Sequence, residues 1–292
     1  YSYNFAVRNF RHGSFGNVTK IDNTRQVKNS ESFFSVAAGM PLAHRGVFLI
    51  RANGGHVNYR YDSDELFADD TDHSRYSFFG IKAELARNTL DKFLYPRRGS
   101  DLKLSGIFVT GRDKYEPFDA KKFLSRTPRQ WFGARFTWDK YFDMPGCSWL
   151  SLGLNVDGVI TNHPEFTTEG ATVMSMPAYE PVPHAQMIYM PDFRGRRFAA
   201  GGIMPTFDLM HNFFLRTGFY AMFREKRSFV PGVSGPVEDK RWHYIAEASL
   251  VYHTPIGPVS LALTKYDLRN WKNMYLTFNF GYAIFAPKGT FY

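Results

Sequence analysis

The fold class of this chain follows from the stretch "SWLSLGLNVDG", residues 148–158. Its large apolar residues alternate with small or polar ones: Leu150, Leu152, Leu154 and Val156 are interleaved with Ser151, Gly153, Asn155 and Asp157. In a β-strand, successive side chains point to opposite faces of the sheet. The stretch therefore predicts a strand with one apolar face and one polar face.

The same alternation returns along the whole chain, as in "QWFGARFTWDK" (130–140) and "NFFLRTGFYAMFREK" (212–226). It predicts about twelve strands, near residues 1–10, 31–40, 46–61, 74–87, 100–112, 129–142, 147–159, 198–208, 212–224, 241–253, 258–267 and 274–286. Most of these reach ten residues, which is about what a tilted strand needs to cross a hydrocarbon layer. Strands of soluble sheets are typically about half as long.

The connections between these strands alternate in length. Long polar segments such as "DSDELFADDTDH" and a stretch of about 35 residues from Thr161 interleave with shorter ones such as "PLAHR", "NTLDKFLYPRRG", "DMPG" and "TPIG". Outer-membrane barrels have short turns on the periplasmic side and longer loops outside, whereas a sandwich has no reason to sort its loops in this way.

The patterns together predict one all-β domain over residues 1–292, a transmembrane antiparallel outer-membrane β-barrel. A spanning sheet must close because lipid leaves no backbone group unpaired. We expect the apolar face outside, with lipid-facing Trp138, Phe213, Phe219 and Phe278, and a polar face lining the lumen. Aromatic residues, 17% of the chain, would form girdles at the interfaces, with almost no conventional core.

Composition and motifs argue against enzyme chemistry in this chain. The segments "GVSGP" and "GCSWL" miss the Gly-x-Ser-x-Gly elbow, the nine histidines have no metal spacing, and the one cysteine, Cys147, excludes an intrachain disulfide. We therefore expect no catalytic residues, no metal and no cofactor. The net charge of +9 suits nucleic acid, anionic lipid or lipopolysaccharide phosphates, but the basic residues lack the aromatic interleaving of a nucleic-acid groove.

The stretch "MPDFRGRRFAAGG", residues 190–202, has three possible interpretations: a basic surface loop, a phosphate-binding glycine turn, or a charged plug inside the barrel. A phosphate turn needs a helix after the glycines, and no helix pattern follows. Glycines in a strand, here Gly201 and Gly202, more often mark a bend or close approach of another backbone, which would let a returning loop lie against the wall. The position at the end of the longest gap favours the plug.

Four segments in order resemble the bacterial surface-antigen superfamily, which includes the outer-membrane assembly barrel and the two-partner secretion transporters. They are a turn, an arginine-glycine motif, a tight hairpin and a terminal β-signal, carried by Tyr95, Pro96 and Gly99, by Phe193, Arg194 and Gly195, by Pro255, Gly257 and Pro258, and by Asn279, Gly281 and Ile284. The resemblance covers the chain from about Asn88 onward and implies a sixteen-stranded barrel. We expect this chain to be its C-terminal part, although a smaller closed barrel is the alternative.

Within the superfamily, "NTLDKFLYPRRG" (88–99) and "NWKNMYLTFNFGYAIF" (270–285) look most like the barrel of patatin-like outer-membrane proteins. This resemblance implies a Gram-negative outer-membrane barrel that anchors, displays or translocates a fused lipid hydrolase absent from this chain. The alternatives are an assembly or insertion factor, a two-partner secretion transporter, or a passive pore. Expected partners are outer-membrane lipids including lipopolysaccharide, the assembly machinery through the terminal strand, and other membrane proteins or a second copy.

The resemblance further implies that the long loop folds into the lumen, where Arg194 pairs with an acid on the inner wall. The alternation points Glu247 and Asp208 inward, so we expect Glu247 as the first partner and Asp208 as the second. A planar guanidinium suits this role because it binds carboxylates through two hydrogen bonds and stays charged. The strand between them offers Arg216 and Arg224 rather than an acid. The alternative is that Arg194, Arg196 and Arg197 are solvated loop charges.

Overall fold

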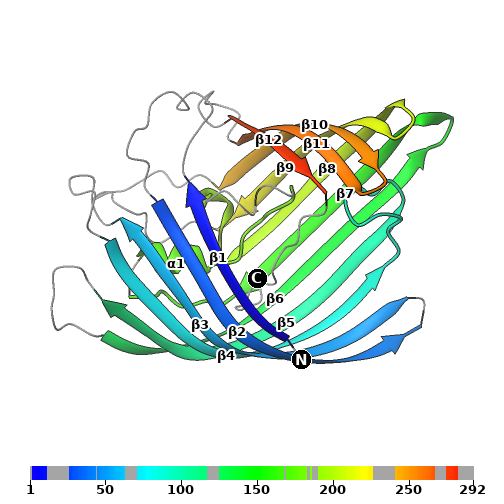
Figure 1. The fold of residues 1–292 in the computed structure, drawn as a ribbon. Coiled ribbons are helices and arrows are strands. Elements are labelled where there is room, and N and C mark those ends of the chain that lie inside the picture. Colours follow the sequence, from blue (N-terminus) through cyan, green and yellow to red (C-terminus); the bar gives the residue numbers. More distant parts are fainter. Residues whose placement is uncertain are drawn as a thin grey trace.

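The chain forms one sheet of twelve antiparallel strands in the computed structural model (Figure 1), which describes residues 2–11, 26–43, 45–62, 71–116, 125–167, 169–182, 185, 190–225, 241–266 and 274–281. The strands are β1 (Ser2–Arg11), β2 (Gln26–Leu42), β3 (Gly46–Asp62), β4 (Thr71–Asn88), β5 (Gly99–Glu116), β6 (Ser125–Met144), β7 (Cys147–Thr161), β8 (Arg197–Met210), β9 (Phe213–Arg224), β10 (Trp242–Thr254), β11 (Gly257–Tyr266) and β12 (Met274–Phe280). Each strand pairs with its sequence neighbours, so all connections are hairpins.

The twelve predicted strands are confirmed, with longer ends in several places. β2 begins at Gln26 rather than at 31, and β6 begins at Ser125 rather than at 129. Backbone pairing continues past the apolar band, and only that band leaves a periodic signal. The last strand, predicted for 274–286, is observed as Met274–Phe280, and Ile284 lies outside the described residues.

Alternate hairpin connections lie at opposite ends of an antiparallel sheet. The predicted sorting by length is confirmed: turns such as 145–146 and 211–212 share one end, here called the short-turn end, whereas the connection over 162–196 lies at the other, the long-loop end. No helix among the described residues is long and apolar enough to cross a membrane.

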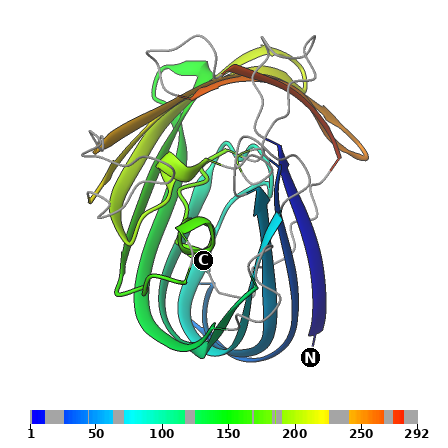
Figure 2. The same ribbon diagram turned by 90° about the vertical axis from the view of Figure 1, so that its left-hand side faces the viewer.

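The sheet curves into an open barrel. Figure 2 shows β1 through β7 wrapping around one side and β8 through β12 curving over the other. Within the described residues, β1 pairs with β2 and β12 pairs with β11, and the two strands do not pair with each other.

The two faces of the sheet are confirmed as predicted. The inner positions of β9 are buried without exception, from Phe214 to Arg224, while the outer positions Phe219 and Phe223 are exposed. On β12, Phe278 is 69% exposed. Large apolar side chains therefore cover the outside of the sheet, which is the reverse of a water-soluble fold.

The expectation of almost no conventional core is wrong, because the interior of the barrel is packed. Near the long-loop end, buried apolar clusters include Trp131, Tyr220, Met222 and Ile245 from the inner wall. The sequence did contain an indication of this core, because the inner face of β9 carries Phe214, Tyr220 and Met222 as well as arginines. Inner positions are apolar where a folded-in segment covers them.

The expected role of Gly202 also needs correction. A Cβ at Gly202 would lie 2.2 Å from Cδ1 of Tyr220, its cross-strand partner on β9. The glycine therefore makes room for an aromatic ring lying flat on the wall, rather than for the backbone of a returning loop.

Candidate functional site

The long connection between β7 and β8, residues 162–196, is called the lumenal segment below, and its described residues, 162–167, 169–182, 185 and 190–196, fold into the barrel. It contains helix α1 (Glu169–Ser175) and a 3-10 turn, η3 (Pro191–Phe193). Figure 2 shows α1 inside the curve of the sheet. The predicted inward-folded loop is therefore present, and the interpretation of "MPDFRGRRFAAGG" as a plug is confirmed in its geometry.

The arginine-glycine motif closes the lumenal segment on itself. Arg194 forms an isolated antiparallel bridge with Ala178, Tyr179 N donates to Phe193 O at 2.9 Å, and Gly195 N donates to Pro177 O at 3.1 Å. The buried Arg194 guanidinium continues this closure: Nη1 donates to the carbonyl oxygens of Met174 at 2.8 Å and Met176 at 3.2 Å. The motif thus ties the end of α1 to the entry of β8.

The predicted lock between Arg194 and Glu247 is wrong. Arg194 Nη2 lies 3.8 Å from Glu180, within its own segment, while Glu247 accepts a hydrogen bond from Ser249. The cation nearest in register to Glu247 is Arg216, which pairs with Ser249 across the β9–β10 ladder. The wall therefore supplies a countercharge for Glu247 one strand away, and the Arg194 guanidinium binds carbonyl oxygens of its own segment.

The prediction that Asp208 is the second partner of Arg194 is also wrong. It lies eleven residues beyond Arg197, the first residue of β8. At about 3.3 Å per residue this is about 36 Å from the point where the lumenal segment enters the strand. Asp208 binds Arg97 instead, at 2.6 Å, near the short-turn end.

The wall holds the lumenal segment through Arg135 on β6. Its guanidinium makes two hydrogen bonds to Asp157 on β7, at 3.1 and 2.6 Å, and Nη2 also donates to Ala178 O at 3.2 Å. Beside it, Tyr179 OH donates to Asn155 Oδ1 at 2.7 Å. All three wall residues, Arg135, Asp157 and Asn155, lie on predicted inner faces. The alternation therefore predicted their side of the sheet, but not which of them would contact the segment. Burial raises the pKa of Tyr179.

Two further wall contacts hold the ends of the segment. On β9, Arg224 Nε donates to Asp192 O at 3.1 Å, which anchors η3. On β5, Asp113 accepts from Thr167 N at 2.7 Å and from Ser74 Oγ at 3.1 Å. Because the contacts come from opposite parts of the sheet, the segment spans the interior rather than lining one side.

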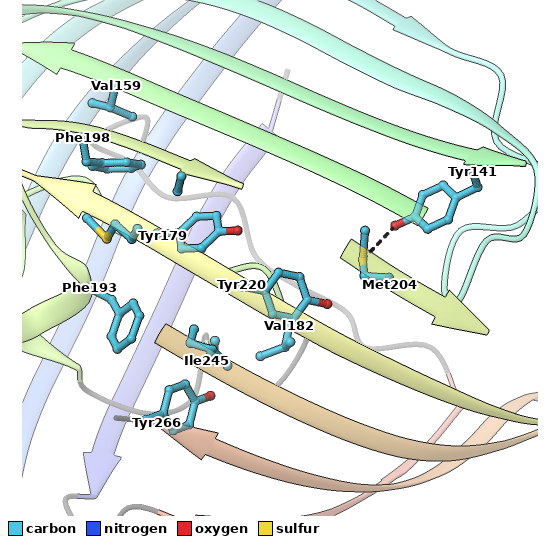
Figure 3. Close-up of a cluster of buried hydrophobic side chains, with 13 residues drawn as sticks. Tyr141, Val159, Tyr179, Val182, Phe193, Phe198, Met204, Tyr220, Ile245 and Tyr266 are labelled. Carbon is cyan, nitrogen blue, oxygen red and sulfur yellow. Dashed lines mark hydrogen bonds between the residues drawn. The ribbon is translucent and has the colours of Figure 1, made fainter. Parts of the chain in front are cut away.

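Apolar side chains from the wall also pack around η3. The Phe193 ring lies 5.6 Å from the ring of His243 and 5.9 Å from that of Tyr266. Figure 3 shows Phe193, Tyr179 and Val182 among wall residues Tyr220, Ile245 and Tyr266. Aromatic contacts of this kind add to the free energy of simple burial.

A second cluster covers the start of the segment. The ring of Phe166 lies 5.0 Å from Tyr76, and the ring of His163 lies 4.6 Å from Trp131. His163 is 1% exposed, and burial lowers its pKa to about 3, with the Arg196 charge acting in the same direction. A buried neutral imidazole among aromatic rings acts here as a packing group.

The turn between β4 and β5, residues 89–98, also folds inward, at the short-turn end, and is called the mouth turn below. Tyr95 OH donates to Ser260 Oγ on β11 at 2.8 Å, and its ring packs on Phe214 and Val251. Burial raises the pKa of Tyr95. The turn thus reaches from β4 and β5 across to β9, β10 and β11.

At the exposed side of the mouth turn, two arginines form ion pairs with acids on the wall. Arg97 binds Asp208 on β8, and Arg98 Nε donates to Asp143 on β6 at 2.6 Å. Gly99 has φ of +102°, and a Cβ there would lie 2.2 Å from Thr89 O, so the turn requires glycine. Tyr95 and Gly99 of the motif therefore hold this turn in its inward-folded position.

The motif residues Pro255, Gly257 and Pro258 lie in the hairpin between β10 and β11, as expected. Gly257 has φ of +139° in the β10–β11 turn, between Pro255 and Pro258, and Thr254 Oγ1 donates to Gly257 O at 2.6 Å. At the terminal strand, Gly281 N donates to Pro258 O at 2.9 Å and Asn279 Nδ2 donates to Ser260 Oγ at 3.4 Å.

No group of three or more His, Cys, Asp and Glu residues in the described part of the chain is arranged to hold a metal ion. The lumenal segment packs against the inner face of the sheet toward the long-loop end, and the mouth turn packs against it at the short-turn end.

These features define the class of protein: an all-β, antiparallel barrel sheet of the outer-membrane type with its interior filled by its own chain. Among solved structures it is similar to BamA from Haemophilus ducreyi lacking POTRA domains 1–3, with a TM-score of 0.52 and 12% identity, over 92% of this chain and 56% of that chain. This chain thus spans about half the length of that BamA chain. At this identity the likeness concerns the fold.

A second solved structure is the beta domain of the Bordetella autotransporter BrkA, matched with a TM-score of 0.37 and 10% identity over 94% of both chains. No family model matches the sequence. No curated protein matches it either.

Proposed function

We propose that this chain is the membrane-embedded barrel of a Gram-negative outer-membrane protein whose interior is closed by the lumenal segment and the mouth turn. The observation that carries the proposal is the outward apolar face, where long strands expose side chains such as Phe132, Ile203 and Phe278. The BamA-like fold supports the same location. An exposed apolar band over tilted strands is stable in lipid and costly in water.

The substitution Leu152→Arg tests the membrane location. Leu152 lies on the outer face of β7, and arginine at the midplane of a barrel's lipid face costs about 2 to 4 kcal/mol. The free energy of unfolding from lipid vesicles, followed by tryptophan fluorescence in urea, should fall by that amount. Met210→Arg at the exposed end of β8 is the control and should cost about 0 to 1 kcal/mol. Equal, small losses for both variants would contradict the membrane placement.

For the biological role we propose that the barrel anchors, displays or translocates a fused patatin-like lipid hydrolase. The support is the resemblance of residues 88–99 and 270–285 to the barrels of patatin-like outer-membrane proteins. The mouth turn built by the first of these segments would face the periplasmic side. Sequencing the gene upstream of Tyr1 tests this role: a Gly-x-Ser-x-Gly elbow with a partner Asp is expected, and its absence from the full-length protein would contradict the proposal.

The second candidate is a barrel that assembles other outer-membrane proteins or secretes a partner. One observation favours it, the BamA-like fold. Upstream sequence would separate the roles, because periplasmic repeat domains would favour assembly. A passive pore is disfavoured by the packed interior, and it predicts a large single-channel conductance that does not change when residues 164–194 are replaced by a short linker.

A further inference from the structure

A shallow groove of about 750 Å³ crosses the outer face of the barrel from β4 to β8. Its floor is a row of small residues, Ala83, Gly106 and Ala134, each the direct cross-strand partner of the next. A Cβ at Gly106 would meet no atom within 4 Å, so packing does not require glycine there and the space above it is open.

Large apolar side chains border this floor. On one side Ile81, Phe108 and Phe132 form a cross-strand row, and the Phe108 and Phe132 rings lie 4.8 Å apart. On the other side the next row is Leu85, Leu104 and Phe136. Each bordering row lies two residues, or about 7 Å, from the floor along the strands. The result is a narrow apolar trough that runs across the strands.

The trough has a polar end. Ala134 pairs with Ile160, and Ile160 pairs with Arg197 at the long-loop end of β8. The Arg197 side chain is 64% exposed, and its ion pair with Glu225 is long, at 3.7 Å. Nearby, Asn162 uses Oδ1 to accept from Phe132 N, so its amide NH2 is the group it can offer to a ligand. One end therefore offers hydrogen-bond donors and a positive charge.

We propose that this groove binds one lipid that carries a phosphate headgroup, with an acyl chain in the trough and the phosphate on Arg197. An apolar channel that ends at an arginine matches an anionic amphiphile in shape and charge, because guanidinium groups bind phosphate through paired, charge-assisted hydrogen bonds. The inference rests on the proposed membrane location. The long-loop end assigns the lipid to the outer leaflet, since the longer loops of outer-membrane barrels are extracellular.

The test uses the whole chain reconstituted in bilayer discs that mix phosphatidylglycerol and phosphatidylcholine. Native mass spectrometry then measures which lipid stays bound as detergent strips the rest. The wild type should retain one phosphatidylglycerol, Arg197→Gln should lower its retention about tenfold, and Gly106→Phe, which fills the trough, should lower it at least as much. Ala134→Phe provides a second filled trough. The control, Ala248→Phe, changes another exposed outer residue on β10 and should retain the lipid like the wild type.

Two failures are distinguishable. If the variants insert into the discs and all retain phosphatidylglycerol like the wild type, the lipid site is wrong and the membrane location stands. The same holds if Gly106→Phe weakens both lipids equally and Arg197→Gln changes nothing, because the groove then binds acyl chains without a headgroup. If the wild type itself does not insert, the proposed membrane location is wrong.

Discussion

The lumenal segment and the mouth turn both fold into the barrel, yet they are held in different ways. The lumenal segment rests on buried groups: the Arg135–Asp157 pair, with side chains 23% and 6% exposed, and aromatic clusters around Phe193 and Phe166. The mouth turn rests on one buried tyrosine and on more exposed ion pairs, Arg97–Asp208 and Arg98–Asp143.

The difference indicates which of the two inward-folded segments is released from the barrel more easily. Exposed ion pairs contribute little free energy, whereas a buried pair that loses one partner leaves an uncompensated charge. We therefore expect the mouth turn to release at low cost and the lumenal segment to stay in place until the barrel itself loosens.

Arg135→Met should have the largest effect. It leaves the Asp157 carboxylate buried without the Arg135 guanidinium that binds it and removes the hydrogen bond to Ala178 O, so the free energy of unfolding should fall by about 3 to 5 kcal/mol. Urea unfolding from vesicles measures it, and single-channel recording should show a larger conductance. The control is Arg135→Met with Asp157→Asn, which should recover much of the loss. If the double variant is no more stable than the single one, the pair does not hold the segment.

Acidification should weaken the lumenal segment through His163. Burial lowers its folded-state pKa to about 3, below the ordinary value of 6.5, so the unfolded state binds more protons between these values. The stabilisation is complete above pH 6.5 and is lost as the pH falls toward 3; at pH 5 the loss is about 2 kcal/mol. Unfolding measured at pH 8 and pH 5 tests this. His163→Leu should remove that part of the pH dependence, and an unchanged dependence would contradict the assignment.

Tyr95→Phe tests the buried contact of the mouth turn. The change removes the hydrogen bond to Ser260 Oγ and keeps the ring on Phe214, so the loss should be about 1 kcal/mol. Tyr95→Ala should cost several times more, because the ring itself is removed. Limited proteolysis between β4 and β5 reports release of the turn. Equal effects of the two variants would mean that the ring contributes nothing.

Arg97→Gln should have the smallest effect. The Arg97–Asp208 pair is partly exposed, so its loss should cost about 0.5 kcal/mol at low salt and less in high salt, where charges are screened. Proteolysis of the mouth turn at two salt concentrations measures the difference. A loss as large as that of Arg135→Met would overturn the contrast between the two closures.

The strands, their facing and the order of their connections could be predicted from the amino-acid sequence because alternation with a period of two is a local property. The inward loop was predicted through the resemblance of Phe193, Arg194 and Gly195 to a known motif. The structure confirms that the loop lies inside the barrel. The partners of Arg194 were not predictable in this way. Side-chain facing restricts a residue to one side of a sheet, but it does not say how far along the barrel the residue lies.

The alternating residues therefore establish an all-β barrel sheet with an apolar outside, and the loop lengths establish which connections share an end. Which charges meet was decided by the three-dimensional arrangement. Strand tilt, register and the path of the lumenal segment bring Arg135 to Asp157 and Ala178, and Arg97 to Asp208. These pairs join strands and turns far apart in the sequence, and their distances depend on the curvature of the whole sheet, which no local pattern records.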